Sequence, residues 1–277
     1  IDGDTADFEK SLNGIGKTAE KAFGGIKSVG TKTVSAIGTG VTAAVGVIAG
    51  AVGAAVNSYA NYEQLVGGID TLFKESSQTV QEYAANAYKT AGMSANKYME
   101  MATSFSASLL QSLGGDTAKA AKVTDMAITD MSDNANKMGT SMDMIQNAYQ
   151  GFAKQNYTML DNLKLGYGGT KTEMERLLAD AQKLSGVEYD ISNLNDVYQA
   201  IHVIQTEMGI TGTTALEASK TISGSMSSAK AAWSNLMTGI ADDNADFGKL
   251  VDNAVSSTET ALQNLLPRIQ IALDGVL

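Results

Sequence analysis

The chain has 277 residues, a formal net charge of −10 and a pI near 4.6, so specific binding to nucleic-acid phosphates is not expected. Cysteine is absent, which excludes disulfides and thiolate metal sites. Histidine occurs only once, which nearly excludes a His-based metal cluster or a Ser-His-Asp hydrolase. Aromatic residues make up only 6% of the chain, and its single proline is Pro267. We therefore predict an all-α, elongated chain rather than a compact enzyme, with no metal and no cofactor.

Residues 1–33 carry the seven-residue repeat of a coiled-coil helix. Their apolar side chains recur at alternating steps of four and three, at Phe8, Leu12, Ile15, Ala19, Ala22, Ile26 and Val29. Glycines inside the repeat cost an isolated helix about 1 kcal/mol each relative to alanine. We therefore expect this helix to pack against partner copies of itself.

Residues 34–58 form an uncharged segment rich in glycine and alanine, which is long enough to span a bilayer. Its glycines lie among Ala, Val and Ile, and the spacing from 46 to 50 lets helix backbones approach closely. Lipid, identical copies and the chain itself are all possible neighbours. Because the coiled-coil repeat continues into this segment, one long helix or two nearly collinear helices are expected over 5–58. We favour packing against protein in the assembled state, with membrane entry as a later role. The glycines concerned are Gly38, Gly46, Gly50 and Gly53.

Residues 59–245 are predicted to form short amphipathic helices, whose ends are marked by capping residues. A break is expected near 76–77, followed by helices over 78–91, 94–113, 116–138, from 140 or 141 to 154, 170–186, 194–208, from 214 and 225–241. Capping-box spacing occurs at Thr170–Glu173 and again at Thr214–Glu217. Residues 246–277 read as a final helix with Pro267 as a kink or restart, and the chain is expected to continue beyond this window.

The most distinctive connection is the loop Gly166, Tyr167, Gly168 and Gly169, which directly precedes a capped helix. Such a loop resembles a phosphate cradle at a helix N-terminus. A Walker loop ends in Gly-Lys-Ser/Thr, however, whereas the order here is Gly-Gly-Thr-Lys, and no strand is expected before it. The pattern favours a tight turn between helices.

The remaining candidates for chemistry have structural interpretations. Asp125, Asp130, Asp133 and Asp143 are predicted to lie on solvated helix faces or near caps, and the segment from 130 lacks the glycine and terminal glutamate of a calcium loop. The single histidine, His202, follows the apolar Ile201 on a predicted helix and is expected as a boundary residue, at the edge of the apolar face, with one hydrogen bond. Methionines at helical spacing, such as Met99, indicate packing in the core or against partner helices. We predict no catalytic site.

One family resemblance covers most of the chain. Residues 156–181 (NYTMLDNLKLGYGGTKTEMERLLADA) resemble the core region of tail tape measure proteins, which occur in phages and prophages of Gram-positive bacteria and in tail-like bacteriocin particles. The segment from 62 (YEQLVGGIDTLF) is similar to the start of that region, and the segment from 222 (ISGSMSSAKAAWSNLMTGIA) to its end. Together they span roughly 59–241, and the Gly-Tyr-Gly-Gly block is the most specific part.

The resemblance implies a structural protein that lies in the tail lumen or at the tail tip, sets tail length and scaffolds polymerisation of the tail tube. Implied partners are further copies of itself, with a trimer as the expected assembly, together with tube proteins, tip or baseplate proteins and assembly chaperones. Particles would assemble in the host cytoplasm, with release or membrane insertion at DNA ejection. Some relatives carry a peptidoglycan hydrolase domain, but none of its residues occurs here.

A second hypothesis comes from a different class of protein. The uncharged segment 34–58 would suit a membrane-active, channel-forming protein or a component of an ejection pore. The two hypotheses are compatible if one chain acts first as a ruler and later in the membrane.

Overall fold

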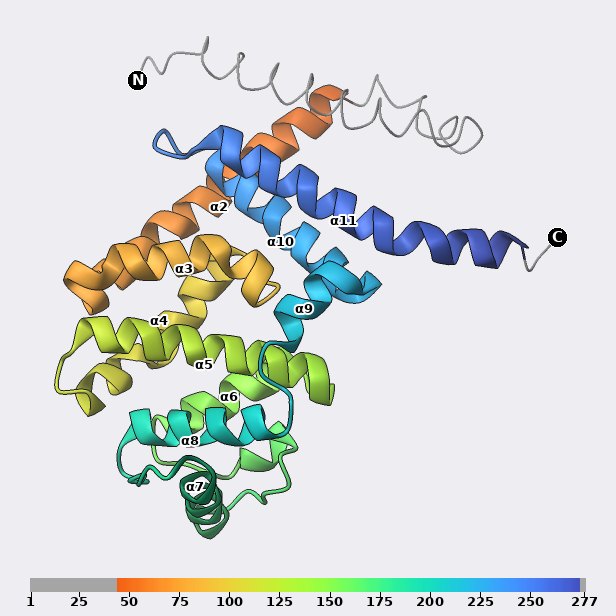
Figure 1. Cartoon of the computed structure of the whole chain (residues 1–277). Coiled ribbons are helices and arrows are strands. Elements are labelled where there is room, and N and C mark those ends of the chain that lie inside the picture. Colours follow the sequence, from red (N-terminus) through yellow and green to blue (C-terminus); the bar gives the residue numbers. More distant parts are fainter. Residues whose placement is uncertain (1–43, 275–277) are drawn as a thin grey trace.

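The computed structural model describes residues 44–274, and every regular element in this range is a helix (Figure 1). The predicted all-α class is therefore confirmed for this part of the chain. The coiled-coil repeat from Phe8 to Val29 and the glycine Gly38 lie outside the described residues.

The helices follow one another through short connections. Their bounds are α2 (Ala44–Phe73), η3 (Lys74–Ser76), α3 (Ser77–Thr90), α4 (Ala95–Ser112), α5 (Thr117–Met138), α6 (Met142–Phe152), η4 (Leu160–Leu163), α7 (Lys171–Ser185), α8 (Leu194–Glu207), α9 (Thr213–Lys220), α10 (Ile222–Gly239) and α11 (Phe247–Asp274).

Most helices start and stop at the predicted caps. The side chains of Ser94, Asp116, Ser141 and Thr170 each accept a hydrogen bond from the backbone N–H three residues later. These bonds satisfy N–H groups that have no partner within the first turn of a helix. At the other end, left-handed glycines follow α5 and α7, where a side chain would be strained. Local capping chemistry thus sets these boundaries.

Helix α2 crosses the predicted division between residues 58 and 59 without a break, and η3 interrupts the chain near the break expected at 76–77. The end of the uncharged segment packs against the chain itself: Ala55 is 1% exposed, and the Ser58 hydroxyl lies 2.6 Å from that of Thr238 in α10. Gly46, Gly50 and Gly53 lie on this helix. Within residues 44–274, no helix is both long enough and apolar enough to cross a membrane.

One hydrophobic core joins the helices from α2 to α8. It contains buried residues from Ile69 to Ile210, and its centre is aromatic, with the Tyr198 ring 5.0 Å from Tyr149 and edge-on to Phe105 at 5.5 Å. A second, smaller cluster lies where α3 meets α10 and α11. Its members are Tyr88, Ala231, Ala232, Leu236 and Ala254.

Helices α10 and α11 lie side by side, and the C-terminal half of α11 extends past α10 (Figure 1). Pro267 was expected to kink or restart this helix. The helix does not restart there, because α11 continues through Pro267 as one element to Asp274. A proline removes a single N–H donor, and the remaining hydrogen bonds of a helix of this length keep the element continuous.

Candidate functional site

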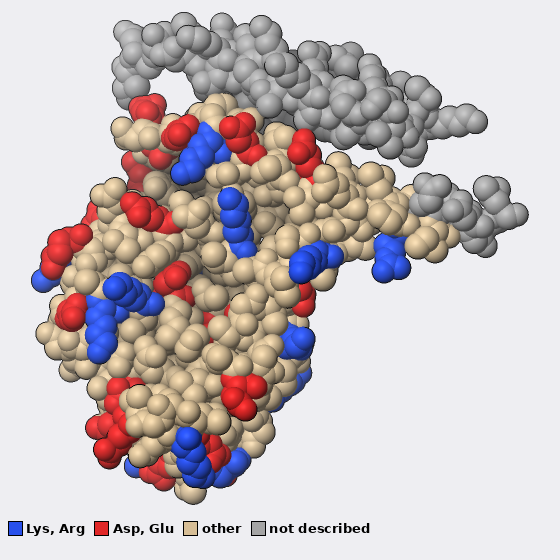
Figure 2. All heavy atoms as spheres, in the orientation of Figure 1, with Lys and Arg blue, Asp and Glu red and all other residues tan. Residues whose placement is uncertain are grey.

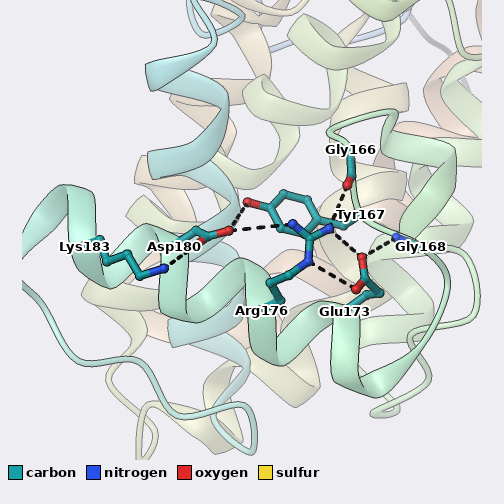
Figure 3. A network of polar contacts seen from close by, with 7 residues as sticks. All are labelled: Gly166, Tyr167, Gly168, Glu173, Arg176, Asp180 and Lys183. Atoms are coloured by element: carbon teal, nitrogen blue, oxygen red, sulfur yellow. Dashed lines mark hydrogen bonds and ion pairs between the residues drawn. The ribbon is translucent and has the colours of Figure 1, made fainter.

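The Gly-Tyr-Gly-Gly loop is fixed to the helix that follows it. Arg176 on the second turn of α7 donates from Nη2 to the carbonyl oxygen of Gly166 at 2.8 Å, and its guanidinium lies over the Tyr167 ring, 4.2 Å from the centroid. The Tyr167 hydroxyl donates to Asp180 at 3.1 Å, one turn further along α7 (Figure 3). The loop is therefore folded back along α7.

Glu173 joins the loop to the start of α7. Its carboxylate accepts from the Gly168 N–H at 3.0 Å and from Arg176 at 2.6 and 3.1 Å (Figure 3). In a capping box this carboxylate would accept the N–H of the cap residue, Thr170. Here the Thr170 N–H instead donates to the carbonyl of Gly168, so the glutamate bonds two residues earlier. The Thr170 hydroxyl accepts the N–H of Glu173 as predicted, but the return bond from the Thr170 N–H to Glu173 is absent. Only half of the predicted capping box is therefore formed, because the loop turns back before the helix begins.

The charges in this network shift one another in a consistent way. Hydrogen bonds from Arg176 lower the pKa of Glu173, and Lys183, 2.8 Å from Asp180, lowers the pKa of that carboxyl group. Burial, reinforced by the hydrogen bond to Asp180, raises the pKa of Tyr167 to about 12. Tyr167 therefore stays a neutral donor at physiological pH, and neither carboxylate has the raised pKa of a general acid.

Two of the three glycines are required by the backbone. Gly166 has φ +85°, which disfavours other residues. A side chain at Gly169 would collide with the backbone carbonyl of Thr158, whereas one at Gly168 would make only an ordinary contact with Glu173. Gly169 thus allows two backbone segments to approach closely, so the motif specifies the shape of a turn.

The polar groups of this site are directed at one another. Within residues 44–274 there is no cluster of three or more His, Asp or Glu side chains that could hold a metal ion. The face in Figure 2 shows Lys and Arg interspersed with Asp and Glu. Sequence reasoning identified the loop but missed Arg176 and Asp180. Arg176 and Asp180 follow Glu173 by three and seven residues, so all three lie on one face of the helix. This spacing could have predicted that they act together.

A second polar cluster overturns the prediction for two of the aspartates. Asp130 and Asp133 were expected on solvated faces, but they are 1% and 0% exposed. The reason is tertiary, because α8 and the start of α9 cover this face of α5. His202 on α8 lies with Nδ1 2.9 Å from the Asp130 carboxylate, in agreement with the predicted boundary histidine. This contact raises the pKa of His202, and burial raises the pKa of Asp130.

Asp133 caps a helix to which it does not belong. Its two carboxylate oxygens accept from the N–H groups of Gly212 at 2.6 Å and Thr214 at 2.7 Å, at the start of α9. The predicted capping box at Thr214–Glu217 is therefore wrong: α9 begins at Thr213 with Gly212 as its cap residue. A carboxylate 79 residues earlier in the chain takes the place of the local side chain.

The other acidic residues and the methionines largely follow prediction. Asp143 is exposed in the first turn of α6, while Asp125 is half-buried and accepts a hydrogen bond from Tyr98 at 2.8 Å. Met99 lies fully in the core, and Met144 is 47% exposed. None of these side chains forms a reactive group with its neighbours.

The chain matches no protein-family model, no curated protein and no solved structure. Its function is therefore argued from its residues and their contacts.

Proposed function

We propose that the chain is the core region of a tail tape measure protein of a phage or a tail-like bacteriocin particle. In this role it sets tail length, scaffolds polymerisation of the tail tube, and is released or inserted at DNA ejection. The observation that carries the proposal is the segment 156–181. Its most specific residues, Gly166 to Gly169, hold a turn against α7 through Arg176 and Glu173. A motif used to shape a turn fits a structural protein better than an enzyme.

The packing of residues 59–241 supports a compact domain within the tape measure. Buried side chains from Ile69 to Ile210 share one core, so these helices do not follow one another in single file. A folded body of this kind suits the tail tip, where tip proteins would hold it, and the elongated part of the ruler would lie in other segments. The coiled-coil repeat over residues 8–29 is the candidate for such a segment.

The C-terminal part of α11 supports association between copies. Three large apolar side chains are exposed there: Leu266 at 46%, Ile269 at 43% and Ile271 at 61%. No charged residue occurs between Glu259 and Arg268. Packing of these side chains against the same helix in neighbouring copies would bury them, consistent with the proposed trimer.

The membrane-active alternative is retained because residues 34–58 carry no charge. Insertion of the whole segment would have to break the contacts of Ala55 and Ser58 with the chain's own helices. We therefore place membrane entry after release from the particle. Flotation of residues 1–60 with liposomes tests this role: a peptide that stays in the soluble fraction would exclude it.

The structural role is tested by purifying tails from the parent particle. The proposal predicts that the chain co-purifies with assembled tails at a small fixed number of copies per tail, as measured by quantitative mass spectrometry. Finding the chain only in membrane fractions, with none in tails, would reject the tape measure in favour of the channel.

A further inference from the structure

Residues 213–274, which comprise α9, α10 and α11 and are called the arm below, are tightly joined to one another. The Trp233 indole donates to the Thr258 hydroxyl at 2.8 Å and so links α10 to α11. A side chain at Gly224 would collide with the backbone of α9, and one at Gly239 with a leucine of α11. Such close approaches fix the three helices as one unit.

The arm meets residues 55–210, called the body below, mainly through small side chains. Helix α9 has no buried residue. On α10, residues at steps of four and three face the body, at Ala231, Asn235 and Thr238. The alanines each bury little apolar area, whereas the ring of Tyr88 in the same cluster is 1% exposed and contributes more. The Tyr88 hydroxyl is buried without a hydrogen-bond partner, which offsets part of the gain from burying the ring.

A groove of about 370 Å³ separates parts of the arm and the body. Its walls include Tyr62, Ala84 and Met99 on the body, and Thr238 and Leu250 on the arm. The arm and the body are therefore not packed against each other along this groove.

Two helix caps cross the boundary in opposite directions. Asp133 of the body caps α9 of the arm, and Asn235 of the arm accepts a hydrogen bond from the Ala95 N–H, at the start of α4 in the body, at 2.8 Å. The only covalent connection between the two parts within the described chain contains Gly209 and Gly212, both at positive φ. Polar caps and a glycine-containing connection thus hold the arm in place.

We propose that the arm is a hinged unit that opens from the body while both keep their helices, with Asp133 as the latch and the connection at 209–212 as the hinge. Local opening of this kind requires a smaller free energy than unfolding of the whole chain, because the core of the body stays closed. The inference depends only on these contacts and holds whether or not the chain is a tape measure.

Thiol labelling tests the opening directly, since the chain has no cysteine. In one variant Ala231→Cys places a thiol on the face of α10 that meets the body. In the matched variant Ala127→Cys places one in the core of the body, where Ala127 is 0% exposed. Labelling rates are followed under native conditions by mass spectrometry of the full chain. We expect position 231 to react faster than position 127. Equal rates would mean that arm and body open only together, and would overturn the proposal.

The latch is tested by adding Asp133→Ala to both variants, with Asp116→Ala as control. Asp116 is exposed and caps α5 through the N–H of Lys119, which also belongs to the body. Asp133→Ala should accelerate labelling at 231 by about fivefold or more, the effect of losing one typical cap, and leave position 127 nearly unchanged. Equal acceleration at both positions would show that Asp133 only supports the whole fold, and would contradict its role as a latch.

An engineered disulfide between arm and body tests the opening even if Asp133→Ala fails to fold. The hydroxyl oxygens of Ser58 and Thr238 lie 2.6 Å apart across the boundary, so Ser58→Cys with Thr238→Cys brings two thiols within disulfide range. Oxidation should slow labelling at 231 to the rate at 127, and reduction should restore it. If the oxidised chain is labelled at 231 as fast as the reduced chain, the arm does not open at this boundary.

Discussion

The guanidinium of Arg176 lies 4.2 Å from the centre of the Tyr167 ring and donates a hydrogen bond to the carbonyl of the preceding residue, Gly166. A single side chain thus holds both the aromatic ring and the backbone of the turn. The cation also meets the Glu173 carboxylate, which in turn accepts the Gly168 N–H. Arg176 is therefore the centre of the turn.

Replacing Arg176 should free the turn while leaving the helices folded. In Arg176→Ala the turn loses the stacking and the hydrogen bond to Gly166, so chymotrypsin should cleave after Tyr167 under conditions in which the native chain stays intact. Arg176→Lys should restore little protection, because an ammonium group lacks the planar fork. The control is Lys171→Ala, since Lys171 pairs only with exposed Glu175 at 3.7 Å. Equal cleavage in Arg176→Ala and the control would contradict this role.

The two glycines at the end of the loop should differ sharply in tolerance. Gly169→Ala introduces a methyl group against the carbonyl of Thr158 and should lower the free energy of unfolding by about 2–3 kcal/mol, the usual range for overpacking. Gly168→Ala meets only the Glu173 side chain at an ordinary distance and should cost less than about 1 kcal/mol. Urea titration measures both, and equal losses would show that the close approach at Gly169 is unimportant.

The single histidine should make stability depend on pH. The hydrogen bond to Asp130 raises the pKa of His202 in the folded chain above its ordinary value of 6.5. Its stabilising effect is therefore fully present below about pH 6.5 and is lost as the pH rises through the folded-state pKa. The free energy of unfolding should fall as the pH rises above about 6.5 in the native chain, and this fall should be absent in His202→Gln. Denaturant titrations at several pH values test this, and a native profile that rises with pH would contradict it.

The exposed apolar side chains of α11 should control association. Leu266→Asp with Ile269→Asp places two charges at positions that are exposed in the single chain, so the monomer should remain folded. Burial of those charges in a bundle would be costly, so analytical ultracentrifugation should show loss of oligomers. Ser256→Asp lies on another exposed face of the same helix and should leave association unchanged. A native chain that is monomeric at all concentrations would contradict the proposed contact.

The sequence predicted what short-range chemistry determines. The helix starts at Ser94, Asp116 and Thr170 were predicted, and Ser141 was one of two candidates for the next start; each of these residues lies immediately before its own helix and bonds within it. Apolar side chains of α7 such as Met174 recur at helical spacing in the sequence and are buried. All these signals occur within a few residues of one another.

Contacts between distant segments could not be predicted in this way. Asp130 and Asp133 have the same local pattern as solvated aspartates, and only the packing of α8 and α9 on α5 buries them. The cap of α9 was misassigned to the box starting at Thr214, because the real acceptor, Asp133, comes from another helix. The sequence left three possible neighbours for the uncharged segment: lipid, identical copies and the chain itself. The contact between Ser58 and Thr238 shows that the end of this segment packs against the chain itself.

The most direct test of the tape measure is the length of the tail. A graded series of in-frame deletions in the full-length gene, each removing whole heptads from a helical segment outside residues 59–241, keeps the helix register intact. A ruler predicts tails shortened in proportion, by about 1.5 Å for each residue removed, as measured by electron microscopy of the parent particle. Insertions of the same size should lengthen tails by the same amount. Tails of unchanged length across the series would contradict the tape measure function.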